Sequence, residues 1–259
     1  MAVVGIPGNI GSSAKAETGQ ASMSAAAVQL RLPATDVWMS QFAGLSKEEI
    51  WEWTGPNHSF NKDWLIGELR NRGGTPVVIN IRADQVSHTA GVPLFEFPGD
   101  LPNAYVTLNI YATIYGRGGN GGGRGNGDKG GDCIHNWIGN RLRINNQGWI
   151  CGGGGGGGGS YWDPGWGNPQ YGAGGGGRPF GVAPWTNFNT PATNGTLEAP
   201  GHGSRGGNFG GGDGGQTGAN GGGAWGPSGE LYGGGASGHA VVGTSPQWIN
   251  TGNIAGPWL

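Results

Sequence analysis

The run CGGGGGGGGS at residues 151–160 places eight glycines in succession, from Gly152 to Gly159. Around this run, 51 of the 144 residues from 116 to 259 are glycine, against 11 of the 115 residues before them. Glycine loses more backbone freedom on folding than any other residue, and it brings no side chain to a core. The C-terminal part of the chain therefore needs something other than an ordinary hydrophobic core to hold it together.

Tryptophans interrupt this glycine-rich part throughout. Gly-rich tracts commonly form flexible linkers, but disordered segments are poor in aromatic residues. The composition therefore favours an ordered structure. The interrupting tryptophans are Trp137, Trp149, Trp162, Trp166, Trp185, Trp225, Trp248 and Trp258.

The ordered alternative is a sandwich of polyglycine II helices. Such helices are extended and left-handed, rise about 3.1 Å per residue and have no internal hydrogen bonds, so eight residues span roughly 25 Å. Their amides must pair with neighbouring helices, which can approach closely because no Cβ atoms intervene. Collagen places glycine at every third position, so contiguous runs exclude a strict triple-helix repeat. We expect an intrachain lattice over residues 116–259 with few regular α or β elements.

Inserts richer in side chains separate the glycine runs, and we expect them to form loops at residues 124–129, 161–171, 182–200 and 225–232. They combine rigid aromatic anchors with adaptable amides, which is the chemistry of a binding surface, although each residue could instead cap its own glycine run. The candidate binding residues are Tyr161, Trp162, Trp166, Asn168, Tyr171, Trp185, Asn187, Phe188, Asn189, Glu198, Trp225 and Tyr232.

Residues 1–115 have the composition of a separate, small α+β domain. The Ala-rich stretch Ser22–Leu32 predicts a helix, and Asn61 is a candidate cap for another over 62–70. Ser46 with Glu49 forms a possible capping box before the apolar residues of 50–53. Residues 75–82 and 105–115 read as strands; in the second, Val106, Leu108, Ile110 and Ile114 share one face, and Thr107, Asn109, Tyr111 and Thr113 share the other.

The charge balance of 14 basic and 16 acidic side chains gives a net charge of −2, which argues against nucleic-acid binding through a strong positive field. The N-terminus lacks the pattern of a secretory signal, and no stretch approaches the length of a membrane span. Cys133 and Cys151 are therefore expected to be buried thiols rather than a disulfide.

None of the catalytic motifs suggested by the sequence has the surrounding residues that its chemistry requires. Gly116, Gly118 and Gly121 match G-x-G-x-x-G after an expected strand, but the following GGRGNGDKGG cannot form the helix that holds a pyrophosphate. Ser204 lies in GHGSRGG, where His202 stands in place of the glycine that a nucleophile elbow requires. The five histidines show no paired metal spacing. We expect neither an enzyme nor a bound cofactor or metal.

Two other classes of protein share parts of this composition. Arginine followed by glycine is typical of segments that bind RNA, but only Arg117, Arg124 and Arg205 fit that pattern among the 144 residues from 116 to 259. A purely structural or ice-ordering glycine slab would present a regular array of small residues, which the irregular aromatic inserts oppose. Both remain alternatives to a binding protein.

Six blocks of the chain form a distinctive set: MAVVGIPGNIGSSA (1–14), WMSQFAG (38–44), YGRGGNGG (115–122), RLRINN (141–146), the glycine octet and SRGGNFGGG (204–212). Together they resemble the long-tail-fibre tip adhesins of T-even-like bacteriophages. The resemblance covers nearly the whole chain. Polar residues stand at Asn9 and Ser22, near positions where members of that family carry aromatic ones.

The resemblance implies a virion protein, made in the host cytoplasm, at the distal tip of the long tail fibre. It implies that residues 1–115 attach to the trimeric distal fibre subunit, and that residues 116–259 present variable loops to a porin-like outer-membrane protein of the host. Ile6, Trp38, Met39 and Phe42 are the fibre-attachment candidates, with burial in a core as the alternative role.

Overall fold

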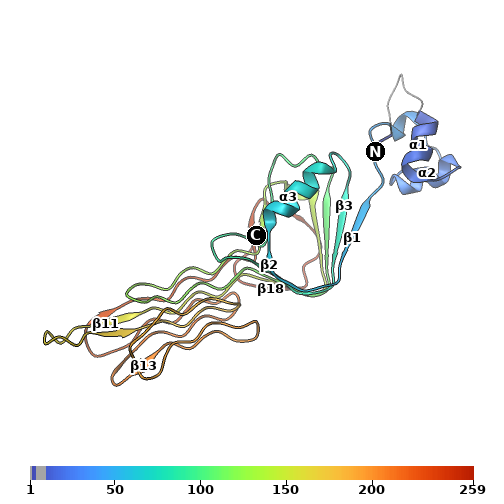
Figure 1. Cartoon of the computed structure of the whole chain (residues 1–259). Helices are drawn as coiled ribbons and strands as arrows, with labels where there is room; N and C mark the ends of the chain where they lie inside the picture. Colours follow the sequence, from blue (N-terminus) through green and yellow to red (C-terminus); the bar gives the residue numbers. More distant parts are fainter. Residues whose placement is uncertain (1, 4–9) are drawn as a thin grey trace.

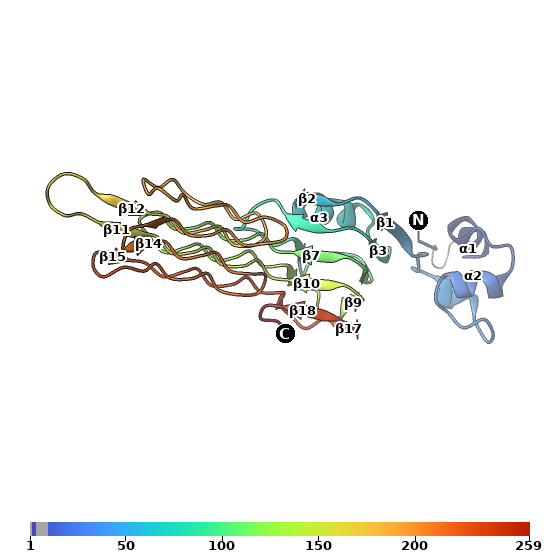
Figure 2. The ribbon, with the colours of Figure 1, turned by 90° about the horizontal axis from the view of Figure 1, so that it is seen from below.

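The computed structural model describes residues 2–3 and 10–259 and has three parts in a row (Figures 1 and 2). A small helical unit at the N-terminus leads into a stack of parallel strands. The glycine-rich segments extend from one side of this stack as a long block. Ile6 and Asn9 lie outside the described residues.

Helices α1 (Ile10–Thr18) and α2 (Met23–Gln29) and the 3-10 helix η1 (Met39–Phe42) form the N-terminal unit. The helix expected over Ser22–Leu32 is confirmed as α2, since the Ala25 N–H donates to Ser22 Oγ at 3.3 Å and caps it. The unit has a core of its own, made of Val3, Ile10, Ala14, Ala26, Ala27, Leu30 and Phe42.

Three parallel sheets form the sides of the strand stack. Each turn of chain adds one strand to the first sheet and one to the second, and the middle turns add one to the third. Between two successive strands of one sheet, the chain runs through the other two sides of the stack. This path supplies the long connection that parallel strands require, as in a β-helix. The first sheet contains β1 (Glu49–Trp53), β3 (Val77–Ile81), β6 (Val106–Ile110), β9 (Leu142–Asn146) and β17 (Gln247–Asn250); the second contains β2 (Asn57–Phe60), β4 (Gln85–Ser87), β7 (Thr113–Tyr115), β10 (Trp149–Cys151) and β18 (Asn253–Ala255); the third contains β5 (Phe95–Phe97), β8 (Ile134–Asn136) and β16 (Val241–Gly243).

The core of the stack lies inside these three sheets. In β6, Val106, Leu108 and Ile110 are fully buried on one face, as expected. The single strand expected over 105–115 is wrong, because this stretch divides into β6 and β7, which belong to different sheets. Helix α3 (Lys62–Asn71) follows β2 and packs against β5, and its N-cap Asn61 accepts a hydrogen bond from the Asp63 N–H at 2.9 Å, as expected. The short 3-10 helix η2 (Gly139–Arg141) leads into β9.

The helix start expected from Ser46 and Glu49 is wrong, because Glu49–Trp53 is strand β1. Its residues alternate: Trp51 and Trp53 pack on the core, whereas Ile50 is 60% exposed. Residue-by-residue pairing of β1 with β3 outweighs the local capping signal, which by itself stabilises a helix by only about 1 kcal/mol.

Buried asparagines join successive turns of the stack. At the end of β8, Asn136 Nδ2 donates to the carbonyl of Thr244 at 2.6 Å, and its Oδ1 accepts from the Ile138 N–H. At the end of β9, Asn146 Nδ2 donates to the carbonyl of Thr251 at 2.7 Å. Each amide satisfies backbone groups where the chain turns a corner and cannot continue the sheet ladder.

The glycine-rich segments are two insertions in the stack. One joins β7 to β8, and the other joins β10 to β16. Strands from both sides of residue 115 share all three sheets, so the hydrophobic core is continuous across the division expected there. Cys133 and Cys151 are free and buried, which confirms the expectation of thiols, and burial raises the pKa of Cys151 to about 11.

The amides of the glycine octet bond sideways to neighbouring stretches of chain with a period of three residues. We call each stretch that runs the length of the block a pass. The N–H groups of Gly153, Gly156 and Gly159 donate to Gly131, Asp128 and Gly125; those of Gly154 and Gly157 donate to Arg178 and Gly175; those of Gly155 and Gly158 donate to Ala219 and Gly222.

The carbonyls of the octet follow the same period. Those of Gly152, Gly155 and Gly158 accept from Gly218, Gly215 and Gly212; those of Gly153, Gly156 and Gly159 accept from Gly238, Gly235 and Tyr232; those of Gly154 and Gly157 accept from Gly119 and Gly122. The octet is therefore enclosed by other passes, and it is buried along its whole length.

The insert at 182–200 is not one loop, contrary to expectation. Gly121 donates to the carbonyl of Val182, and Gly176 donates to that of Thr193, so both flanks of the insert run along the block as passes. Only the residues around Asn187–Thr190 form a turn at the far end. Side chains are tolerated on these passes because they lie at the outside of the block.

Candidate functional site

The far end of the block gathers turns from distant parts of the chain (Figures 1 and 2). The antiparallel strands β11 (Ser160–Trp162), β12 (Gln170–Gly172) and β15 (Glu230–Leu231) pair there, and β13 (Arg205–Gly206) forms a hairpin with β14 (Phe209–Gly210). The loop between β11 and β12 reaches furthest from the stack. The inserts expected at 161–171 and 225–232 thus lie together at this end.

An arginine joins three of these turns. Arg124 Nε and Nη2 donate to the Glu230 carboxylate at 3.0 and 3.3 Å, and the guanidinium lies 3.7 Å from the centroid of the Tyr161 ring. The Tyr232 hydroxyl donates to the same carboxylate at 2.7 Å. The hydrogen bonds from Arg124 and Tyr232 hold the pKa of Glu230 below its ordinary value, so the carboxylate stays charged. We call Arg124, Glu230, Tyr232 and Tyr161 the arginine cluster.

Several candidate aromatic side chains rest against the block rather than project from it. The Trp162 and Phe209 rings are stacked at 5.3 Å. The Trp225 ring covers Gly210, and the Phe188 ring covers Gly206, so closely that a Cβ atom on either glycine would meet the ring. For these residues, packing on the glycine block accounts for at least one face of the ring.

Two tryptophans have no such support and lie largely in solvent. Trp166 is 85% exposed on the loop between β11 and β12, and Trp185 is 76% exposed on the pass that leads to the Asn187 turn. Binding energy at protein interfaces concentrates in a few side chains, among which tryptophan and tyrosine are enriched. Trp166 and Trp185 are therefore the strongest contact candidates among the aromatic residues.

The three candidate asparagines meet in one small pocket of about 220 Å³. Asn187 also has a structural role, because its Oδ1 accepts from the Tyr171 N–H at 2.9 Å and its Nδ2 donates to the Pro169 carbonyl at 2.9 Å. The residues that line the pocket are Asn168, Gln170, Asn187, Phe188, Asn189, Gly206 and Gly207.

Glu198 does not belong to this end. Its neighbour Leu197 packs against the small cluster of Val86, Tyr115 and Cys151, where the block joins the stack. Conversely, sequence reasoning missed Phe209 and Gln170 as parts of the far end. Phe209 is hidden within a glycine-rich run, and its only signal is that it is the sole aromatic residue between Gly201 and Gly215.

The N-terminal attachment candidates divide by exposure. Trp38 is 78% exposed and Met39 is 47% exposed, whereas Phe42 is buried in the core of the helical unit. Met39 and Phe42 line an apolar pocket of about 170 Å³ between α1 and α2, together with Met23. Ser22 at this pocket is the cap of α2, and Ile6 lies outside the described residues.

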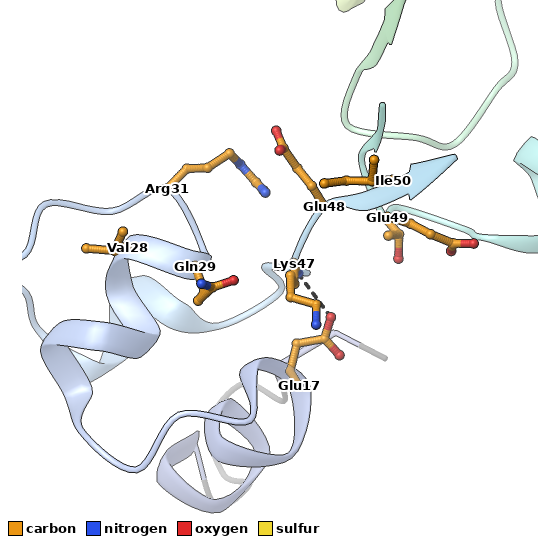
Figure 3. Close-up of a pocket in the computed structure, with 9 residues that line it drawn as sticks. Glu17, Val28, Gln29, Arg31, Lys47, Glu48, Glu49 and Ile50 are labelled. Carbon is orange, nitrogen blue, oxygen red and sulfur yellow. Dashed lines mark hydrogen bonds between the residues drawn. The ribbon is translucent and has the colours of Figure 1, made fainter. Parts of the chain in front are cut away.

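A polar cleft of about 730 Å³ separates the helical unit from strand β1 (Figure 3). The Lys47 N–H donates to the Glu17 carboxylate at 3.0 Å on one side of it. The Arg31 guanidinium lies 5.3 Å from the Tyr105 ring, whose hydroxyl bonds to Glu48. Burial and that bond raise the pKa of Tyr105 to about 12, so its hydroxyl keeps its proton. These contacts link the helical unit to the stack.

Asp132 connects the two places where the chain returns from the glycine-rich insertions to the stack, before β8 and before β16. It accepts from the His239 N–H at 2.8 Å and from Lys129 Nζ at 2.8 Å, and His135 Nε2 lies 3.0 Å from its Oδ2. Burial acts to raise the pKa of Asp132, but these hydrogen bonds hold it well below its ordinary value. Within the described ranges, no group of three or more His, Cys, Asp or Glu side chains could hold a metal ion, and no helix could cross a membrane.

Two family models cover the chain almost completely. The model described as the N-terminal domain of phage tail fibre adhesin Gp38 matches residues 1–43, and the model described as phage tail fibre adhesin Gp38 matches residues 48–259. The chain belongs to the phage tail fibre adhesin Gp38 family. This adhesin is thus a component of a phage tail fibre, as its sequence blocks indicated.

Similar proteins agree with this assignment. The adhesin is 66% identical to the receptor-recognizing protein gp38 of Salmonella phage S16 over 251 residues, 96% of this chain and 97% of that protein. A chain in the crystal structure of the gp37–gp38 adhesin tip complex of the bacteriophage S16 long tail fibre matches it with a TM-score of 0.85 and 63% identity, over the whole of both chains.

Proposed function

We propose that this adhesin stands at the distal tip of a long tail fibre and binds a porin-like outer-membrane protein of the host through its far-end turns. The observation that carries the proposal is a pair of exposed tryptophans held by a hydrogen-bonded block: Trp166 on the loop between β11 and β12, and Trp185 on the pass that leads to the Asn187 turn. Rigid aromatic side chains on a preordered support lose little entropy on contact, so most of their interaction energy appears as affinity.

We further propose that the block is a polyglycine II sandwich. The three-residue period of the octet's hydrogen bonds, donated and accepted sideways by successive passes, supports this assignment because polyglycine II has three residues per turn and no internal bonds. In this arrangement the block acts as a stiff support that holds its terminal loops in a fixed relation to one another.

Receptor binding is tested with the variant Trp166→Ala/Trp185→Ala. Its adsorption to host cells and its binding to purified outer-membrane proteins should fall at least tenfold, because interface energy concentrates in a few Trp and Tyr residues. Trp149→Ala is the matched control, since Trp149 is 47% exposed on the stack, away from the far end. Unchanged adsorption of the double variant would contradict the proposed binding end.

We propose that the helical unit binds the trimeric distal subunit of the fibre. The supporting observation is that Trp38 and Met39 are exposed next to the apolar pocket lined by Met23 and Phe42. The variant Trp38→Ala/Met39→Ala should fail to co-purify with that subunit and still bind cells. Ile249→Ala serves as the control, because Ile249 is 57% exposed at the other end of the stack. Normal co-purification of the double variant would place fibre attachment elsewhere.

A further inference from the structure

The pocket at the far end differs from its surroundings in the chemistry of its lining. Asn168, Gln170 and Asn189 contribute side-chain amides that make no hydrogen bond to the described part of the chain. An amide offers two N–H donors and a carbonyl acceptor, so these three groups can bind hydroxyls that donate and accept at once. None of the lining side chains is charged.

One wall of the pocket is aromatic. The Phe188 ring lies on the backbone of Gly206, where an added Cβ would stand 2.7 Å from the ring, and it also lines the pocket. The face of a phenyl ring carries the negative end of its quadrupole and accepts C–H and N–H groups that point at it. A ligand with one apolar C–H face and a rim of hydroxyls therefore matches this lining.

The walls are held in place before any ligand arrives. Thr186 Oγ1 donates to the Tyr171 carbonyl at 2.5 Å and accepts from the Phe188 N–H at 3.1 Å. Asn187 bridges Tyr171 and Pro169 as described above. Two segments whose bonded residues are 15 to 18 positions apart in the sequence are thus held together beside the pocket. Preordered walls lower the entropy lost on binding a small ligand.

We infer that this pocket is a subsite for one neutral pyranose sugar of the bacterial surface. A volume of about 220 Å³ suits a single sugar ring, the free amides suit its hydroxyls, and Phe188 suits its C–H face. This inference rests on the proposed function, because it assigns part of the same binding end to glycan. It adds a second chemical class to the surface that the adhesin recognises.

The direct test uses saturation-transfer NMR of the full-length adhesin with methyl glycosides of glucose, galactose and N-acetylglucosamine. At least one should bind saturably, and its affinity should fall at least tenfold in Asn168→Ala/Gln170→Ala. The matched control is Gln147→Ala/Gln247→Ala, which removes two exposed amides on the stack and should bind as the original protein does. If no glycoside binds, or if the double variant binds equally well, the inference is wrong.

Charged sugars provide a further check. The methyl glycoside of glucuronic acid should bind no more tightly than the neutral glycosides, because the lining offers no cation. Tighter binding of the acid would overturn the inference. Competition with purified lipopolysaccharide and with capsular polysaccharide then identifies which of the two supplies the sugar.

Binding to outer-membrane protein stripped of glycolipid separates this inference from the proposed function. Loss of glycoside binding in Asn168→Ala/Gln170→Ala, with binding to the stripped protein unchanged, supports both. If the double variant loses only protein binding and no glycoside binds the original adhesin, the pocket contacts polypeptide, and only the sugar inference fails. If the glycoside binds but the stripped protein does not, the proposed protein receptor is wrong and the inference stands.

Discussion

Gly155 illustrates how the block depends on the absence of a single atom. Its N–H donates to Ala219, its carbonyl accepts from Gly215, and an added Cβ would collide with the carbonyl of Gly235. Because the obstacle is backbone, it cannot move aside as a flexible side chain would. Even an alanine there forces neighbouring passes apart and breaks hydrogen bonds in both of them.

We predict that Gly155→Ala destabilises the adhesin by more than about 3 kcal/mol, at or above the upper end of ordinary overpacking costs. Gly125→Ala is a matched control, because a Cβ at Gly125 would meet nothing within 4 Å. Thermal unfolding followed by circular dichroism measures both. Equal midpoints for the two variants would mean that the passes are not closely packed around the octet.

The lowered pKa of Asp132 makes the free energy of unfolding depend on pH in the acidic range. A carboxylate whose pKa is lowered in the folded state contributes stability that is present above its unfolded value of about 3.9 and is lost as the pH falls toward the folded value. The adhesin should therefore lose stability progressively below about pH 4, as Asp132 begins to bind a proton.

We predict that Asp132→Asn lowers the stability at pH 7 by about 2 kcal/mol, the size expected for hydrogen bonds to a charged group. The same variant should lose less stability than the original protein between pH 4 and pH 2. Thermal midpoints over this range provide the measurement, with Asp100→Asn as the exposed control. Parallel pH profiles for Asp132→Asn and the original protein would refute the role of this carboxylate.

Among the elements, the turns of the far end depend on side-chain contacts as well as on their passes. The arginine cluster connects the turn at Arg124 with the strands that contain Tyr161 and Glu230. All its members are solvent-exposed to some degree, so the ion pair adds little to global stability. Its effect should be local, on the relative positions of three loops.

We predict that Arg124→Glu weakens adsorption to host cells without changing the thermal midpoint. The swapped pair Arg124→Glu/Glu230→Arg should recover most of the adsorption, because the ion pair is rebuilt in reverse. Amide exchange at Tyr232 and Gly233 should accelerate in the single variant and slow again in the swapped pair. Equal adsorption of the single and swapped variants would show that the ion pair does not position the loops.

The sequence predicted the elements unevenly, for reasons that particular residues explain. Asn61 and Ser22 correctly predict where their helices begin, because a capping hydrogen bond involves only residues that are close in the sequence. The strand Glu49–Trp53 was missed because its pairing partner β3 lies about 28 residues away in the chain. The passes around Thr193 were mistaken for a loop, since their hydrogen bonds to Gly176 and His202 leave no trace in local composition.

At the scale of the whole molecule, the glycine runs predict the glycine-rich block, but they do not predict the parallel strand stack from which it extends. The block extends from a strand stack whose turns are completed by β8 to β10 and β16 to β18, all beyond residue 115. Short strands such as Ile134–Asn136 are too brief to predict from periodicity when glycine surrounds them. Likewise, Asn168, Asn187 and Asn189 were each predicted, whereas their meeting in one pocket follows only from the fold.

The helical unit and the stack have separate hydrophobic cores, and the two family models divide at the same place, between residues 43 and 48. The contacts that link these parts include the bond from Lys47 to Glu17 and the packing of Arg31 on Tyr105, which are polar and partly exposed. Such contacts contribute little compared with a buried core.

We therefore predict that a chain of residues 44–259 folds with a thermal midpoint within a few degrees of that of the full adhesin, since about 1 kcal/mol shifts the midpoint of a large domain by only 2–4 °C. It should adsorb to host cells but fail to join the fibre. The full-length Trp38→Ala/Met39→Ala variant is the control, because it should show the same separation of functions with every residue retained. An unfolded truncated chain would mean that the helical unit completes the stack and is not an independent attachment module.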